Sequence, residues 1–246
     1  MRPALVMASA ETVGADPESV IDAGCAVEMV HAFSLIHDDL PAIDDDDLRR
    51  GRPTCHVKFG QALAVLAGDA LFALAFQVLS AAPGSPRALV EAVRVLSVSS
   101  GSNGLVGGEV LDVLSEGKEV GPSVVDSIHL KKTAALIAAS CRIGGLLGGA
   151  TPSQTNALDR FGTEIGLAFQ IADDLLNETS TSEQLGKAAG SDRAHKKATY
   201  PSVHGIEASK DAAKRRVEAG LAALEAGKLG SETLRALALF AIDRDW

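Results

Sequence analysis

Gln61-Ala-Leu-Ala-Val-Leu-Ala-Gly-Asp-Ala-Leu-Phe-Ala-Leu-Ala-Phe-Gln-Val-Leu-Ser-Ala-Ala82 is the most membrane-like stretch of this sequence. It is long enough to cross a bilayer, which takes about 20 residues. Asp69 lies near its centre, and a charge at that depth of a bilayer is unfavourable. We therefore predict a buried helix of a globular protein and no membrane span.

Apolar residues recur at helical spacing through most of the chain. Aromatic residues make up only 4% of the sequence, and the nine prolines fall mostly between the apolar segments, which favours an all-α fold. The segments 63–76 and 133–147 are apolar on nearly every side, which is typical of helices surrounded by other helices. No segment resembles a linker, so we predict a single large helical bundle over residues 1–246. The expected helices are 17–37, 57–80, 86–99, 104–115, 122–148, 152–176, 208–226 and 231–242.

The charge balance limits what the chain can bind. Acidic residues number 32 and basic residues 23, which gives a net charge of −9, so nucleic acid is not an expected partner. Any anionic ligand must be met by local cations. Cys25, Cys55 and Cys141 form no CxxC pair, which argues against a disulfide framework or a thiolate zinc site. The beginning of the chain lacks a signal-peptide pattern, and we expect a cytoplasmic protein.

A first acidic cluster follows one of the apolar segments. Six carboxylates fall within residues 38–47. Pro41 must end the preceding helix, which places Asp38 and Asp39 on its last turn and Asp44 on the outgoing loop. Like charges repel at this end of a helix, where the helix dipole is also unfavourable to them. One interpretation is a solvated charge run neutralised by the arginines that follow, Arg49, Arg50 and Arg52.

A second Asp-Asp pair, Asp173-Asp174, ends another strongly apolar segment. Gln170, Asp173 and Asn177 are spaced i, i+3 and i+7 and share one helix face. Two such helices predict two oxygen-rich walls that face each other across a cavity. Oxygen ligands without His or Cys select Mg²⁺, which takes one or two carboxylates and completes its shell with water and phosphate oxygens. We therefore expect a diphosphate ligand.

An EF-hand is the competing metal site for the first cluster. Leu48 stands where that loop needs an acceptor, and the central glycine is missing, so we reject it. Several cations could instead meet a phosphate. Each alone would be an ordinary surface charge, but beside two acidic walls they indicate a phosphate-binding site; they are Arg49, Arg50, Lys132, Lys187 and Lys197.

The sequence resembles the trans-isoprenyl diphosphate synthases of the polyprenyl synthetase family, bacterial farnesyl and geranylgeranyl diphosphate synthases in particular. The resemblance covers nearly the whole chain. Its anchors are Ser34-Leu-Ile-His-Asp-Asp-Leu-Pro-Ala-Ile-Asp44 with Asp-Asp-Leu-Arg-Arg-Gly-Arg-Pro53, Leu66-Ala-Gly-Asp-Ala70, His129-Leu-Lys-Lys-Thr133, Gly166-Leu-Ala-Phe-Gln-Ile-Ala-Asp-Asp174, Leu185-Gly-Lys187 and Lys197-Ala-Thr-Tyr-Pro201.

The resemblance implies a helical bundle around a deep central cavity, commonly in a homodimer, and a role for each matching residue. Asp38 and Asp44 would hold two Mg²⁺ ions on an allylic diphosphate, and Asp173 would hold a third. The residues that would surround this substrate are Arg49, Lys132, Thr133, Gln170, Lys187 and Lys197. Positions that bind isopentenyl diphosphate correspond to Arg2, His31 and Arg50. The expected catalytic set is Asp38, Asp39, Asp44, Arg49, Lys132, Asp173 and Lys187.

The implied reaction is the condensation of isopentenyl diphosphate with C5 or C10 allylic diphosphates. Mg²⁺ and cations neutralise the departing diphosphate, the allylic cation is attacked by the second substrate, and a proton is lost. Water would quench the cation, so we expect segment 177–198 to act as a lid; a simple connection between helices is the alternative. Phe33 stands five residues before Asp38, with Met29 one turn below. An aromatic residue at this position limits chain growth in the family, which favours farnesyl diphosphate, although ordinary core packing of Phe33 and a C20 product remain open.

Three features differ from the family pattern. The chain begins at Arg2-Pro3, where the family has further helices and a lysine that helps to bind isopentenyl diphosphate. Asn177 stands at a usual Asp, and Glu109 replaces a usual Gln. A catalytically weak partner subunit of another prenyl synthase therefore remains an alternative. A class I terpene cyclase is another, although the Arg49-Arg50 pair and segment 197–201 favour condensation.

Overall fold

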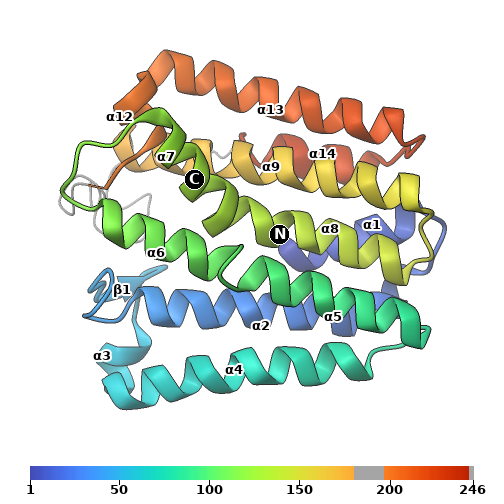
Figure 1. Ribbon diagram of the computed structural model, residues 1–246, viewed down its shortest axis with the longest axis horizontal. Helices are drawn as coiled ribbons and strands as arrows, with labels where there is room; N and C mark the ends of the chain where they lie inside the picture. The colour runs from blue at the N-terminus through green and yellow to red at the C-terminus, as the bar shows by residue number, and fades with distance from the viewer. Residues whose placement is uncertain (180–196, 244–246) are drawn as a thin grey trace.

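The computed structural model describes residues 1–179 and 197–243. These residues form the predicted all-α bundle, with long helices that run along one common direction (Figure 1). The first half contains α1 (Arg2–Thr12), the 3₁₀ turn η1 (Pro17–Val20), α2 (Ile21–Asp38), β1 (Leu48–Arg49), β2 (Arg52–Pro53), α3 (Cys55–Phe59), α4 (Gln61–Ala81), α5 (Pro86–Ser100) and α6 (Leu105–Ser115). The second half contains α7 (Pro122–Ile128), the π-helix η2 (His129–Ala134), α8 (Ala135–Leu147), α9 (Pro152–Thr179), α12 (Tyr200–His204), α13 (Ile206–Ala226) and α14 (Glu232–Phe240).

The expected helices are confirmed, with two changes inside them. The segment 57–80 is divided at Gly60, whose φ of +89° suits glycine, so α3 and α4 are separate. The segment 122–148 contains a π-helical turn, η2. Such turns are rare and frequently lie at functional sites.

α1 was not predicted, because its apolar run is short. Its Leu5 and Val6 are fully buried, and the helix packs against α8. The approach is very close: a Cβ built on Gly144 of α8 would overlap the carbonyl oxygen of Val6. Burial on α8 therefore stabilises a helix that local propensity alone would leave marginal.

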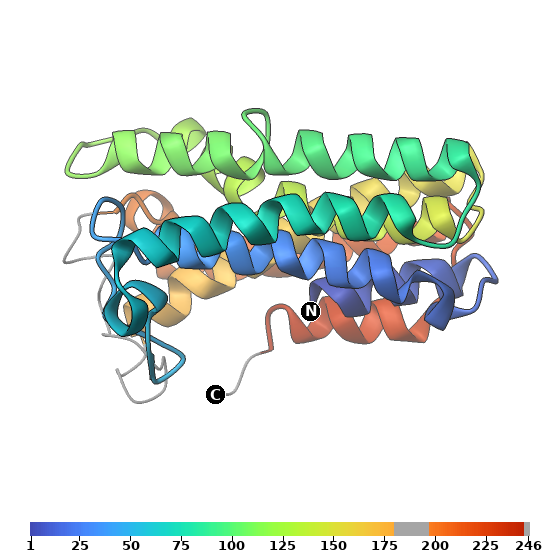
Figure 2. The same cartoon turned by 90° about the horizontal axis from the view of Figure 1, so that it is seen from below.

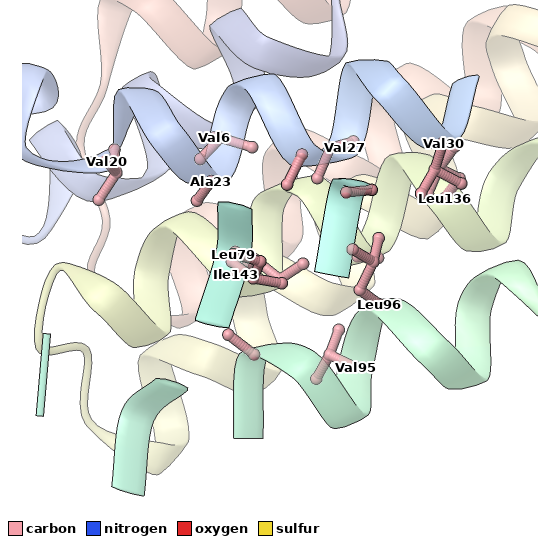
Figure 3. Close-up of a cluster of buried hydrophobic side chains, with 14 of the residues drawn as sticks. Val6, Val20, Ala23, Val27, Val30, Leu79, Val95, Leu96, Leu136 and Ile143 are labelled. Carbon is pink, nitrogen blue, oxygen red and sulfur yellow. The ribbon is translucent and has the colours of Figure 1, made fainter. Parts of the chain in front are cut away.

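The α8 helix lies at the centre of the molecule, as its continuous apolar pattern predicts. Leu136 and Ile143 pack on one side among residues of α2, α4 and α5, such as Val30 (Figure 3). Ile137 and Cys141 pack on the other side with residues of α9 and α13. Each fully buried aliphatic side chain contributes roughly 1.5–3 kcal/mol of transfer free energy, so α8 ties the two halves of the core together.

α4 differs from the prediction that it is surrounded by helices. It packs on α2, but its opposite side is open, and Leu63 and Leu66 are 57% and 60% exposed. The helix therefore lies at the edge of the bundle (Figures 1 and 2). By length and composition alone, α4 and the segment Pro17–Asp38 are each apolar enough to cross a membrane. Of the 18 residues that give each its high hydropathy, 22% in α4 and 44% in Pro17–Asp38 are buried within the bundle.

The orientation of two helices creates the functional end of the molecule. α2 and α9 both finish at the left-hand end in Figure 1, where the β1–β2 hairpin and α12 also lie. The hairpin has a two-residue turn, Arg50-Gly51, with φ of +53° and +72°, as a tight primed turn requires. The acidic pairs that end α2 and α9 are thereby brought to the same region.

Candidate active site

A cavity of about 830 Å³ opens between α2, α6, η2, α9 and the segment before α12. Its size is in the range typical of small-molecule sites. The following sequence-predicted residues line it: Arg2, His31, Asp38, Asp44, Arg49, Arg50, Lys132, Thr133, Gln170, Asp173 and Lys197. Lys187 and most of the expected lid 177–198 lie outside the described residues.

The first acidic wall is shaped by the loop after α2. Asp38 is the last residue of the helix, and the amide of Asp44 donates to the carbonyl oxygen of Asp38 at 2.9 Å. This contact folds the loop back after Pro41, so that both carboxylates reach the cavity. Asp173 lies on the wall formed by α9.

The second aspartate of the first pair has a different position. Asp39 is 3% exposed and does not belong to the described cavity wall. It accepts a hydrogen bond from Nε of Arg49 at 2.7 Å. Burial raises the pKa of Asp39 above its ordinary value, and the pair with Arg49 only partly offsets this. Asp39, expected among the catalytic residues, thus orients Arg49.

Asp174, in the last turns of α9, also holds its neighbours in place, although unlike Asp39 it lines the cavity. It is 5% exposed and accepts hydrogen bonds from the Gln170 amide at 2.9 Å and from the backbone of Tyr200 at 2.7 Å. Its other contact is Nε2 of His129, at 3.1 Å. Gln170 in turn accepts from the Thr133 hydroxyl at 2.6 Å. The carboxylate therefore joins α9, η2 and α12 within the cavity wall.

A buried lysine occupies the acidic side of the cavity. Nζ of Lys132 lies 2.7 Å from Glu109, 2.8 Å from Asp112 and 4.0 Å from Asp38. Burial alone would lower the pKa of Lys132, but the surrounding carboxylates outweigh it and raise the pKa well above its ordinary value. The lysine therefore stays charged.

The crowding of carboxylates changes the pKa of Glu109. Burial, together with nearby Asp38 and Asp112, raises the pKa of Glu109 from 4.5 to about 7, although Lys132 opposes the shift. Oε1 of Glu109 is buried and has no hydrogen-bond partner among the described residues. A neutral Gln at this position would avoid this charge.

Lys197 crosses the cavity to the first wall. Its Nζ donates to both carboxylate oxygens of Asp44, at 2.8 and 2.9 Å, and lies 3.8 Å from Asp112. Sequence reasoning did not identify Asp112, which is 7% exposed. The available signal was its position three residues after Glu109 on the same face of α6.

The basic side of the cavity contains Arg2, His31, Arg49 and Arg50. Burial first, and then the charges of Arg2 and Arg50, lower the pKa of His31 from 6.5 to about 2. His31 is therefore neutral at physiological pH. The arginines supply positive charge and the imidazole a neutral hydrogen-bonding group, an arrangement suited to a second anionic ligand.

The donor set fits Mg²⁺ held together with a diphosphate. Asp38, Asp44 and Asp173 offer hard oxygen ligands. Among residues 1–179 and 197–243, no three His, Cys, Asp or Glu side chains already form a closed metal cage. Since Mg²⁺ is usually bound by one or two carboxylates plus phosphate oxygens, this divided arrangement suits a metal that arrives with its ligand.

The chain-length candidates lie next to the cavity rather than on its described wall. Phe33 is 9% exposed within the core. Its ring packs edge-on against Phe72 of α4, with 4.8 Å between centroids, and Phe72 packs in the same way on Phe76, at 5.1 Å. Met29 is partly buried against the same core. An aromatic row therefore follows the α2–α4 interface.

Residues 1–228 match the Polyprenyl synthetase family. Geranylgeranyl pyrophosphate synthase 4 of Arabidopsis thaliana is 48% identical over 86% of this chain. The chloroplastic geranylgeranyl pyrophosphate synthase of Capsicum annuum is also 48% identical over 86% of it. The chain spans 58% of the length of each of these two relatives.

Solved structures are similar over almost the whole chain. A geranyltransferase from Helicobacter pylori, complexed with magnesium and isoprenyl diphosphate, superposes with a TM-score of 0.87 and 31% identity, covering 98% of this chain and 82% of that one. An FPP/GFPP synthase from Zymomonas mobilis gives 0.86 and 35%, with the same coverage. By fold, by the two acidic walls and by sequence, the chain belongs to the polyprenyl synthetase family.

Proposed function

We propose that the chain is a Mg²⁺-dependent prenyltransferase that condenses isopentenyl diphosphate with allylic diphosphates. The observation that carries the proposal is the meeting of Asp38 and Asp173, from the ends of two helices, on one cavity that also contains Lys132 and Lys197. Acidic and basic groups so arranged suit a metal-bound diphosphate.

The residues divide into groups by the step they serve. Asp38, Asp44 and Asp173 would hold Mg²⁺, which neutralises negative charge developing on the leaving diphosphate. Lys132, Lys197 and Arg49 would stabilise the same oxygens, so that the allylic C–O bond can ionise.

The second substrate and the exclusion of water involve other parts of the wall. Arg2, His31 and Arg50 would hold isopentenyl diphosphate by its charge. The apolar side chains of Ile128 and Phe169 line the cavity and would keep water from the allylic cation. The released diphosphate, held by the cations, is our candidate base for the final proton.

We propose geranylgeranyl diphosphate as the main product, because the curated relatives described above are geranylgeranyl pyrophosphate synthases. This replaces the expectation of farnesyl diphosphate drawn from Phe33. A C15 product remains the second candidate on a specific observation: Phe33 is backed by Phe72, so its ring has little room to move aside for another isoprene unit.

Product sizing tests the proposal. The purified protein is incubated with Mg²⁺, labelled isopentenyl diphosphate and, separately, C5, C10 and C15 allylic diphosphates, and the dephosphorylated products are separated by length. We expect C20 from every primer and no product when EDTA replaces Mg²⁺. Accumulation of a C15 product would indicate that Phe33 limits the length of the prenyl chain. Turnover of a prenyl diphosphate without isopentenyl diphosphate would indicate a cyclase. No turnover would favour the partner-subunit alternative.

We also propose that the protein forms a homodimer through the open side of α4 and its neighbours. Leu63, Leu66 and Leu74 share one face of α4 and are 57%, 60% and 39% exposed. α6 presents a second apolar stripe, Val106, Val110, Val113 and Leu114, which is 40–58% exposed. α5 packs beside α4 and continues into the line of α6 (Figure 2). Exposed apolar side chains gathered on two helices favour an interaction site, and a second copy supplies an equally apolar partner.

A further inference from the structure

Among the described residues of the cavity, Asp112 is the carboxylate with one oxygen that forms ion pairs with two lysines. Oδ2 lies 2.8 Å from Nζ of Lys132 and 3.8 Å from Nζ of Lys197. Lys132 comes from η2, and Lys197 comes from the segment before α12. Asp112 therefore connects α6 to two other parts of the wall by charge.

The other carboxylates near these lysines each lie close to one of them. Glu109 pairs with Lys132 at 2.7 Å, and Asp44 pairs with Lys197 at 2.8 Å. Asp38 lies 4.0 Å from Lys132. The charges alternate along the series Asp38, Lys132, Asp112, Lys197 and Asp44, with Asp112 at its centre.

This arrangement matters because the lysines repel each other. Their Nζ atoms lie 2.8 and 3.8 Å from the same oxygen of Asp112, so two like charges stand close together and need a carboxylate between them. Under the proposed function, Asp38 and Asp44 turn to the metal when the diphosphate binds. Each lysine then loses one carboxylate, and Asp112 is the remaining counter-charge common to both.

We propose that Asp112 is a positioning residue that retains Lys132 and Lys197 side by side, aimed at the diphosphate, once the metal has taken Asp38 and Asp44. The inference rests on the proposed function and deepens it. It makes an unusual prediction: removing a negative charge from an anion site should weaken anion binding. If Asp112 acted only through its charge, its removal would strengthen binding instead.

The first test needs no ligand. Lysine acylation is measured site by site, by peptide mass spectrometry, in the metal-free protein. In the wild type, Lys132 and Lys197, whose side chains are only 20% and 12% exposed and are paired with carboxylates, should react at least about tenfold more slowly than exposed Lys58 and Lys210. Asp112→Asn should accelerate both buried lysines several-fold. Glu109→Gln, the matched control, should accelerate Lys132 alone.

The second test measures binding of inorganic diphosphate in the presence of Mg²⁺ by calorimetry. Asp112→Asn is expected to weaken it about tenfold, and Glu119→Gln, which removes a carboxylate at an exposed site away from the cavity, to leave it unchanged. Equal or tighter binding by Asp112→Asn, or unchanged acylation of Lys197, would overturn the inference. If the wild type binds no diphosphate, the proposed function fails, and the acylation pattern still decides whether Asp112 positions both lysines.

If Asp112→Asn does not fold, the wild-type protein still tests the inference. Acylation of Lys132 and Lys197 as fast as that of Lys58 would by itself refute it.

Discussion

Glu109 makes stability depend on pH in a direction opposite to most carboxylates. The folded protein keeps its proton up to about pH 7, whereas the unfolded side chain releases it near 4.5. The folded state therefore binds more protons between these values, and the free energy of unfolding falls as the pH rises through this window. Glu109→Gln should raise the free energy of unfolding at pH 8 by on the order of 1–3 kcal/mol, and the gain should disappear below pH 4.5. Urea unfolding at several pH values measures it.

The matched control is Glu119→Gln, which removes the same charge from an exposed site. We expect a change within about 0.5 kcal/mol and no trend with pH. An equal gain at pH 4.5 and pH 8 for Glu109→Gln would contradict the assigned burial of this carboxylate.

The pair of Asp39 and Arg49 gives a second prediction at the scale of single residues. Asp39→Asn leaves the half-buried guanidinium without its strongest partner, and breaking such a pair is costly. We expect a loss of about 2–3 kcal/mol in stability and a higher KM for the allylic substrate, because Arg49 loses its orientation. Thermal unfolding and steady-state kinetics test this. A changed kcat with unchanged KM would show that Asp39 does more than orient Arg49.

Most cavity residues could be predicted from sequence because spacing on a helix fixes a face. Gln170, Asp173 and Asn177 all line the cavity as their i, i+3, i+7 spacing requires. The different positions of Asp38 and Asp39 were not predictable, since Asp39 is held by tertiary pairing with Arg49, whereas Asp38 faces the cavity. Asp112 was missed for the same reason: its partner Lys132 lies 20 residues away.

At the scale of elements, Gly108 sets the distance between α6 and the π-turn. A Cβ built on it would overlap the backbone nitrogen of Lys132. Gly108→Ala must therefore push α6 from η2, and we expect about 1–3 kcal/mol of destabilisation together with a lower kcat, because Lys132 moves. Gly230→Ala is the control, since nothing lies within 4 Å of a Cβ there. Equal stability of the two variants would contradict this packing.

The elements that the sequence did not predict share a physical cause. α1 and α12 are stabilised by tertiary contacts, α1 with α8 and α12 with α9 and α13. The π-turn lies against α6 at Gly108, a contact between segments distant in sequence. By contrast, α8 was predictable because burial on all sides leaves a continuous apolar pattern. For α4 the same apolar pattern gave a wrong prediction of burial on all sides. A helix with one exposed apolar face has the same composition as a helix that is buried all round.

At the scale of the whole molecule, the exposed face of α4 predicts the oligomeric state. Leu66→Asp places a charge on the proposed interface without touching the core. We expect a wild-type dimer and a variant that is mostly monomeric at micromolar concentration, since a buried unpaired charge opposes association. Light scattering after size-exclusion chromatography measures both. A monomeric wild type would contradict the proposed interface.

The central claim is that the two acidic walls act together on one diphosphate. The most direct test is a double-mutant cycle on condensation rates with Asp38→Asn, Asp173→Asn and the combined variant at saturating Mg²⁺. Each single change should reduce kcat by at least about 10²-fold, and the combination should be little worse than either, because groups that act as a unit lose their effect together. Near-wild-type turnover by Asp173→Asn, or fully additive losses, would contradict the account.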